Sequence, residues 1–197
     1  MVGLGNPGPE YARTRHNAGF ILADALARAW SLGTFRRRGP ARVTQGSVGD
    51  AAVALIKPQT YMNRSGAAVR LLLTEPDFDP THHLLVVTDD AALPLGTFRL
   101  RARGSHGGHR GLESVEHALA SREYARLRIG VGPQPAGVIL EDYVLEEFAD
   151  AELEELGKLV PELCDAVTCW VTDGVAVAMN RYNKRRTGGP ADGRTEG

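Results

Sequence analysis

Apolar and polar residues along the chain follow two periods, one typical of helices and one typical of strands. Apolar side chains recur at the spacing of an amphipathic helix at Phe20, Leu22, Leu26 and Trp30. Short apolar or alternating runs bounded by turn residues instead indicate strands. The strands expected on this basis cover residues 2–4, 42–48, 52–56, 83–88, 98–103 and 125–131, with a turn at Gly49-Asp50 between the second and the third.

The helices expected from the same pattern cover residues 18–32, 65–73 with Ser65 as the cap, 111–120 and 150–172, with a last helical piece reaching Tyr182. Pro161 should kink or split the long helix, and Gly174 should end it. Alternating strands and helices indicate an α/β protein: a single domain over residues 1–183 whose twisted, mostly parallel or mixed sheet is sandwiched between helices. Residues 184–197 are basic and then rich in Gly and Pro, so we expect a flexible tail.

Composition narrows the class of protein. The 197 residues, 43% apolar and 24% charged, match an ordinary globular domain. The longest apolar run, residues 51–56, is far shorter than the ~20 residues of a membrane helix, and the N-terminal residues do not resemble an export signal. Only Cys164 and Cys169 are present, so we expect reduced thiols and a cytoplasmic protein.

The net charge of −1 conceals a basic segment. Residues 97–128 hold seven arginines and three glutamates, and Arg99, Arg101 and Arg103 alternate along a predicted strand. Side chains two apart on a strand share a face, so these arginines would form a one-sided ridge suited to phosphates. An ordinary solvated face is the alternative.

A glycine-rich motif near the N-terminus, residues 3–8, matches the dinucleotide-binding pattern G-x-G-x-x-G. That loop needs a full preceding strand and free amide donors at a helix start. Pro7 and Pro9 remove two of these donors, so we expect a stiff loop that presents Asn6 instead.

Neither a covalent nucleophile nor a metal site is supported. No serine lies in G-x-S-x-G, and neither cysteine lies in a loop beside a histidine. The pairs His82-His83 and His106-x-x-His109 lack further ligands at a suitable spacing, so we expect these histidines to be exposed or locally hydrogen-bonded.

Several polar residues at loop edges are instead suited to general-base chemistry: Asn6, His16, Asn17, Asn63 and Asp89. Asp89 ends the apolar run HLLVVT, at the end of a strand where α/β proteins place their sites. An aspartate that holds one imidazole nitrogen of His16 would leave the other free to take a proton from water. Carboxamides could bind an ester and its developing oxyanion, although each asparagine could equally be a turn-former.

Four motifs occur in an order that resembles bacterial peptidyl-tRNA hydrolases: GLGNPGPEYARTRHNAG, KPQTYMNRSG, GSHGGHRGL and RLRIGVG. The resemblance covers residues 2–182. It implies a single α/β domain that hydrolyses the ester between a peptide and its tRNA. It also implies a cytosolic monomer that needs neither a metal nor an organic cofactor, with tRNA as its partner and no membrane association.

The resemblance also implies roles for individual residues. His16 would be the general base that activates water, and Asp89 would orient and polarise the imidazole of His16. Asn6 would contact the substrate near the ester. Asn63, with Met62 beside it, would bind the peptidyl end.

The remaining roles concern the walls of the cleft. Tyr11 and Tyr61 match aromatic positions that line it. Arg101 and Arg128 match a pair that clamps the 5′-phosphate of tRNA, and Arg99 belongs to the same basic ridge. The loop of residues 132–143 matches a mobile lid.

Three departures from the family pattern stand out. Arg110 replaces an asparagine that contacts the peptide, and arginine has donors but no acceptor, so it can take over only part of that role. Ala92 replaces an acidic residue. Fewer residues than usual precede Asn6, so the first strand is expected to be frayed.

Two other functions stay open at this point. A non-catalytic RNA-binding relative would not require the set of Asn6, His16, Asn63 and Asp89 that this chain retains. A general esterase for small molecules would have no use for the arginine ridge, because such substrates carry no phosphate.

Overall fold

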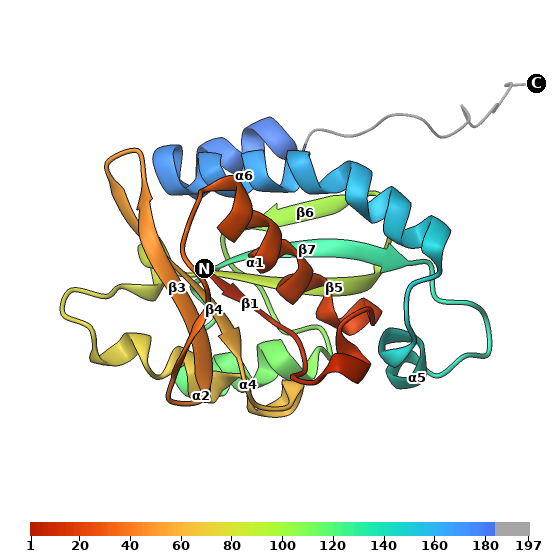
Figure 1. Cartoon of the computed structure of the whole chain (residues 1–197). Helices are drawn as coiled ribbons and strands as arrows, with labels where there is room; N and C mark the ends of the chain where they lie inside the picture. The colour runs from red at the N-terminus through yellow and green to blue at the C-terminus, as the bar shows by residue number, and fades with distance from the viewer. Residues whose placement is uncertain (184–197) are drawn as a thin grey trace, which may run out of the picture.

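Seven strands form one mixed sheet in the computed structural model, which describes residues 1–183 (Figure 1). The strands are β1 (Val2–Gly3), β2 (Arg36–Arg38), β3 (Ala41–Val48), β4 (Ala51–Pro58), β5 (Leu85–Pro94), β6 (Phe98–Arg101) and β7 (Ala125–Gly132), in the order β2-β3-β4-β1-β5-β7-β6. The central strands β4, β1, β5 and β7 are parallel, whereas β2, β3 and β6 pair antiparallel to their neighbours. This arrangement confirms the predicted fold class.

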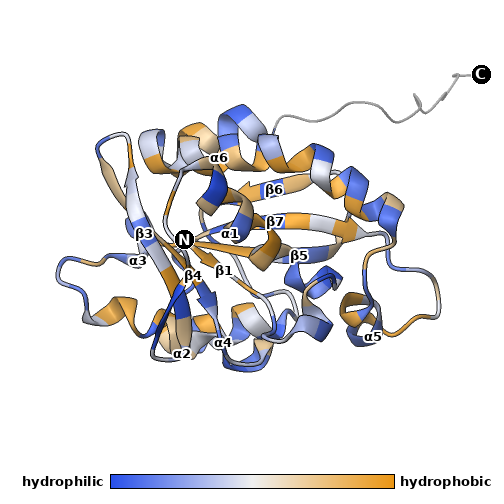
Figure 2. Ribbon diagram, viewed as in Figure 1, coloured by the Kyte–Doolittle hydropathy of each residue, from blue (hydrophilic) through white to orange (hydrophobic). Residues whose placement is uncertain are grey.

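Helices cover both faces of the sheet. The helices α1 (Ala18–Ala29) and α6 (Asp150–Tyr182) pack on one face, and α2 (Gly66–Val69) and α4 (Arg110–Leu119) pack on the other (Figure 1). Successive side chains of β5 alternate between the two layers, because Leu85 and Val87 belong to the first core and Val86 to the second. The apolar sides of the helices accordingly face the sheet (Figure 2).

The first strand is short but firmly held, so the expected fraying is wrong. The amino group of Met1 donates to the Ala54 carbonyl at 2.8 Å, and the Leu4 amide donates to the Val87 carbonyl at 2.9 Å. Val2 and Leu4 are fully buried. Pairing with β4 on one side and β5 on the other therefore gives Asn6 a rigid support.

Several predicted boundaries differ from the structure. Residue 83 ends a short helix, α3 (Pro80–His83), rather than beginning a strand. The predicted helix 65–73 is the short α2 followed by the 3-10 turn η4 (Leu72–Thr74), and the Ser65 hydroxyl donates to the Met62 carbonyl instead of capping. Strand β6 ends at Arg101, so Arg103 lies beyond the ladder.

The long helix α6 behaves as predicted at one position and not at the other. It continues through Pro161, where buried leucines on both sides, Leu159 and Leu163, hold it against the sheet. The predicted split there is therefore wrong. Gly174 adopts φ 83° and interrupts the helix as expected.

Two short elements were not anticipated. Strand β2 has three consecutive exposed arginines and therefore lacks the apolar alternation that marks a strand. Helix α5 (Leu140–Leu145) begins within the segment 132–143 that was expected to be a lid loop and extends beyond it, so that segment is part loop and part helix. No helix within residues 1–183 is long and apolar enough to cross a membrane. The predicted tail, residues 184–197, lies outside the described residues.

Candidate active site

His16 and Asp89 meet at the carboxyl end of the buried part of β5. His16 lies in the 3-10 turn η2 (Arg15–Asn17) that leads into α1, and its Nδ1 is 3.0 Å from each carboxylate oxygen of Asp89. The Asp89 side chain is 3% exposed, and that of His16 is 13% exposed. The predicted proximity of the two residues is confirmed, and the second ring nitrogen of His16, Nε2, has no partner within residues 1–183.

A close backbone contact brings these two residues together. A Cβ on Gly19 would lie 2.5 Å from the Leu4 amide nitrogen and 2.7 Å from the Val87 carbonyl oxygen. Only glycine therefore lets the start of α1 rest directly on β1 and β5. The preceding turn then carries His16 to the end of β5.

A second imidazole, that of His109, also contacts Asp89. His109 precedes α4, and its Nδ1 accepts hydrogen bonds from the Gly111 and Leu112 amides at 3.1 and 3.3 Å. Because Nδ1 accepts, Nε2 carries the proton and donates to Asp89 Oδ1 at 3.1 Å; Thr88 Oγ1 lies 2.6 Å from the same nitrogen. The expectation that His109 is exposed or only locally bonded is wrong, because its bond to Asp89 crosses between two elements. His82 does bond locally, to Asp79.

The two imidazoles determine the electrostatics of Asp89. Burial alone would raise the pKa of this carboxyl, but the adjacent His16 and His109 outweigh burial and hold the pKa below its usual range. Asp89 therefore stays ionised and accepts the Nδ1 proton of His16. The Nε2 atom of His16 is then an unprotonated acceptor, as a general base requires.

The amide group of Asn6 is oriented by its own hydrogen bonds. Asn6 lies in the loop between β1 and the 3-10 turn η1 (Pro9–Tyr11), and its Oδ1 accepts from the Met62 amide at 2.8 Å. Asn17 clamps the Asn6 backbone by donating to its carbonyl at 3.0 Å and accepting from its amide at 2.8 Å. This bond fixes the orientation of the amide, and the NH₂ group of Asn6, which has no partner within residues 1–183, is available to donate to a substrate.

Arg15, which the sequence did not single out, secures the turn that carries His16. Its buried guanidinium donates to both Glu152 oxygens, at 2.9 and 3.2 Å, and lies 4.4 Å from the centre of the Tyr143 ring. Its backbone amide donates to the Glu146 carbonyl at 3.1 Å. The turn at His16 is thus tied to α5 and to the start of α6.

The residues expected to bind the peptidyl end lie on the 3-10 turn η3 (Met62–Arg64) and beside it. Met62 is buried in the core, so it contributes its backbone amide to Asn6 rather than an exposed side chain. Asn63 is exposed one residue further on. Tyr61 is 63% exposed and Tyr11 is half-buried, and their place in a substrate cleft stays a prediction.

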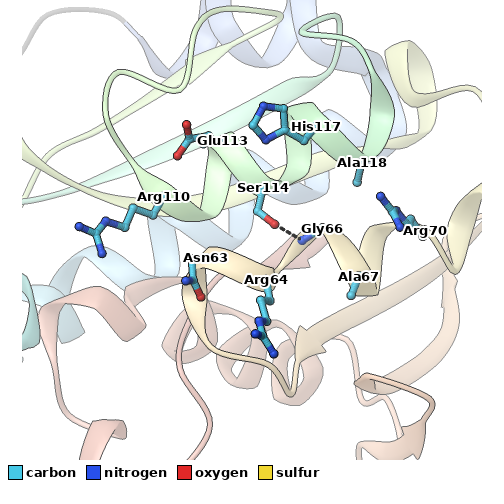
Figure 3. A pocket seen from close by; sticks show the side chains of 10 residues that line it. All are labelled: Asn63, Arg64, Gly66, Ala67, Arg70, Arg110, Glu113, Ser114, His117 and Ala118. Carbon is cyan, nitrogen blue, oxygen red and sulfur yellow. Dashed lines mark hydrogen bonds between the residues drawn. The ribbon is translucent and has the colours of Figure 1, made fainter.

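Arg110, at the start of α4, pairs with Glu141 at the start of α5. Its side chain points away from Ser114 and Gly66 (Figure 3). Both partners are well exposed, so the pair forms a surface bridge between α4 and the lid segment. The residue that departs from the family pattern thus has an acidic partner within the segment predicted to be a lid.

The predicted arginine ridge exists on β6 and β7. Arg99 lies directly opposite Arg128 in the antiparallel ladder, and Arg101 lies opposite Arg126. Arg126 is 2% exposed and donates to the Ser105 carbonyl, so it is a structural residue. We call the remaining three, Arg99, Arg101 and Arg128, the guanidinium ridge.

The ridge and the catalytic strand are linked through Asp90. The Arg128 Nε atom lies 3.1 Å from Asp90 Oδ2, and Asp90 also accepts from the Ala92 amide at 3.0 Å. In the part of the chain that the structure describes, Arg99 and Arg101 have no carboxylate partner. Their charges are therefore available to an anionic ligand.

His16, Asp89 and His109 also form a candidate metal cluster, because their ligand atoms lie within 4.8 Å of one another. In the hydrogen-bonded arrangement described above, however, both imidazole nitrogens that face Asp89 carry protons. A metal would have to displace both protons. The geometry is that of an imidazole–carboxylate–imidazole network.

Comparisons with known proteins agree with one another. Residues 1–189 match the family model described as peptidyl-tRNA hydrolase. Peptidyl-tRNA hydrolase of Chloroflexus aggregans is 46% identical over 184 residues, which cover 93% of this chain and 97% of the relative. The enzyme of Rhodopirellula baltica is 44% identical over 183 residues, covering 93% and 96%. The crystal structure of peptidyl-tRNA hydrolase from Acinetobacter baumannii has a TM-score of 0.85 and 33% identity, with 93% of each chain covered.

Proposed function

The chain belongs to the peptidyl-tRNA hydrolase family, and from this membership and the site geometry we propose that it hydrolyses the ester between a peptide and tRNA with water activated by His16. The observation that carries the proposal is the position of His16 Nδ1, 3.0 Å from both oxygens of Asp89. This contact leaves Nε2 free as the base.

The reaction follows from the positions of these groups. His16 Nε2 takes a proton from water while the water oxygen attacks the ester carbonyl carbon. The NH₂ group of Asn6 donates to the oxyanion that forms. When the tetrahedral intermediate collapses, the C–O bond to the ribose breaks and the imidazolium returns the proton to the departing ribose oxygen. The products are tRNA with a free hydroxyl and a peptide carboxylic acid, which releases its remaining proton to solvent and becomes a carboxylate.

The order of strands across the sheet supports an orientation for the substrate. Strand β5 carries Asp89, β7 and β6 carry the guanidinium ridge on one side of it, and β1 leads to Asn6 on the other. We propose that the ridge binds a tRNA phosphate, that the ester lies at His16, and that the peptide passes Asn63. Tyr11 and Tyr61 would line the cleft.

We propose that the enzyme works without a metal, as a cytoplasmic monomer. The test is release of the acyl group from an N-acetyl-aminoacyl-tRNA by the purified chain in excess chelator. Full activity is expected, since the network needs protons where a metal would bind. Activity that disappears with chelator and returns with added metal would assign His16, Asp89 and His109 to metal binding instead.

Replacing Arg101 with glutamine should weaken binding of uncharged tRNA and lower the slope of log affinity against log salt by about one phosphate contact. The reason is that Arg101 is exposed and has no carboxylate partner within residues 1–183. Titrations at several salt concentrations measure both quantities. Arg37→Gln, on β2 at the opposite edge of the sheet, is the matched control. An unchanged slope in the Arg101 variant would remove this residue from the tRNA site.

Replacing Arg110 with asparagine should raise kcat/KM a few-fold. The substitution restores an acceptor beside the cleft and removes the surface bridge to Glu141, which as an exposed ion pair stabilises by at most about 1 kcal/mol. Steady-state kinetics on N-acetyl-aminoacyl-tRNA measure the effect. Glu141→Gln removes the charge pair but leaves Arg110 in place, so it breaks the same bridge without putting a carboxamide at position 110, and the comparison separates the two causes. No gain in the Arg110 variant would make this departure neutral.

A further inference from the structure

A groove of about 620 Å³ lies between η3, α2 and α4, next to Asn63 (Figure 3). Its two walls touch at the base, where the Gly66 amide donates to Ser114 Oγ at 3.0 Å. A Cβ on Gly66 would lie only 2.2 Å from the Ser114 carbonyl oxygen. Helices α2 and α4 therefore approach each other here so closely that only glycine fits. This contact fixes the shape of the groove.

Positive side chains dominate the groove. Arg64 on η3 and Arg70 at the end of α2 are exposed, and no carboxylate within residues 1–183 pairs with either guanidinium. Arg110 is engaged by Glu141, and Glu113 is the one acidic side chain among the described residues that line the groove. Among the described residues, the groove is thus lined by two guanidinium groups without a carboxylate partner and by one carboxylate.

The position of the groove decides which part of the substrate reaches it. Helix α2 packs on β4, and β4, β1, β5, β7 and β6 follow one another across the sheet. Asp89 lies on the middle strand of this series, and the guanidinium ridge lies on the last two. The α2 wall of the groove therefore lies on the β4 side of Asp89, whereas the ridge lies on the β7–β6 side. The α4 wall begins at Arg110, directly after His109, which contacts Asp89. With its tRNA at the ridge and its ester at His16, a substrate would carry its peptide past Asn63 toward the groove.

We infer that this groove is a subsite for the peptide and favours acidic side chains one or two residues before the residue esterified to tRNA. Arginine binds carboxylates through paired N–H donors, which gives both charge and geometric selection. The inference rests on the proposed function, since it assumes that peptidyl-tRNA occupies the catalytic pair. A second RNA contact is the competing use of the same charges, and the experiment below distinguishes the two.

The test compares blocked tripeptidyl-tRNAs that share one tRNA and one esterified residue. One series carries Asp, Asn or Lys immediately before the esterified residue, and a second series carries them one residue earlier. We expect kcat/KM to fall in the order Asp, Asn, Lys at one of these positions. The ratio of Asp to Lys should be about three- to tenfold, the scale of two exposed ion pairs, and should shrink as salt is added.

The double variant Arg64→Gln, Arg70→Gln should bring this ratio close to one. The matched control, Arg36→Gln with Arg42→Gln, removes two exposed arginines outside the groove and should keep the ratio. A ratio near one in the unmodified protein, with N-acetyl-aminoacyl-tRNA still hydrolysed, overturns the inference and leaves the proposed function intact. Failure to hydrolyse any of the substrates overturns both. If the double variant instead loses kcat/KM equally on all three peptides and binds uncharged tRNA more weakly, the groove contacts RNA and the inference is overturned.

Discussion

Replacing His16 with alanine should lower kcat by about 10²- to 10⁴-fold, the usual contribution of a general base. Of the two imidazoles that contact Asp89, that of His16 has a second nitrogen, Nε2, without a protein partner within residues 1–183. Both ring nitrogens of His109 are hydrogen-bonded to protein groups. Release of labelled acyl group from N-acetyl-aminoacyl-tRNA under single-turnover conditions measures the chemical step directly.

His82→Ala is the matched control for this variant. His82 also contacts an aspartate, Asp79, at 2.8 Å, but the pair is exposed on α3 away from the cleft. Its removal should leave the rate unchanged. Affinity for uncharged tRNA and the thermal midpoint should stay near their original values in the His16 variant. Unchanged turnover in that variant would remove the assigned mechanism.

Replacing Asp89 with asparagine should cost about 10²- to 10⁴-fold in kcat, because it changes the tautomer of His16. His109 must keep its proton on Nε2, since its Nδ1 accepts two backbone amides, so the new amide oxygen turns toward His109. The amide NH₂ then faces His16 Nδ1 and forces that nitrogen to be an acceptor. The proton moves to Nε2, and the base is lost.

The control and the readout follow from this reasoning. Asp79→Asn makes the same chemical change in the exposed aspartate–histidine pair and should not alter the rate. Single-turnover rates and tRNA affinity separate chemistry from binding. An Asp89→Asn variant with more than a tenth of the original rate would show that the carboxylate does not orient the base.

The depressed pKa of Asp89 determines how this carboxyl contributes to stability at different pH. A carboxyl whose folded pKa lies below its unfolded value stabilises the fold above the unfolded pKa, and this contribution is lost as the pH falls through the folded pKa. Asp89 therefore stays ionised throughout the neutral and mildly acidic range. We expect thermal melts in this range to show little change of the thermal midpoint on account of Asp89. A loss of stability there that the Asp89→Asn variant does not show would contradict this assignment.

The parts of the site that the sequence predicted are those determined by long apolar elements. Asp89 follows a continuous apolar strand and His16 precedes an amphipathic helix, so the pattern predicted the place of each residue at the end of an element, and the family resemblance supplied their roles as a pair. The alternation of Arg99 and Arg101 likewise predicted a common face, which the register with β7 confirms. Periodicity was informative at each of these positions.

The parts that were missed depend on contacts between distant segments or on local capping. His109 is both a helix cap and a partner of Asp89, and a single histidine after two glycines does not distinguish this role from a solvated one. Arg15 acts through Glu152, which is far away in the sequence, so only folding reveals their proximity. Asn17 was a candidate, but its bonds to the Asn6 backbone were not predicted. Helix α5 is only six residues long, too short to develop a clear period.

The measurement that tests the central claim most directly is the tautomer of His16. It is read by ¹⁵N–¹H NMR of the uniformly ¹⁵N-labelled protein at neutral to mildly alkaline pH. Samples of His16→Ala and His109→Ala assign the signals of the two rings. We predict a proton on Nδ1 and none on Nε2 for His16, with the reverse for His109. A His16 ring protonated on Nε2 and bare on Nδ1 would contradict the account, because it would leave no base directed toward the substrate.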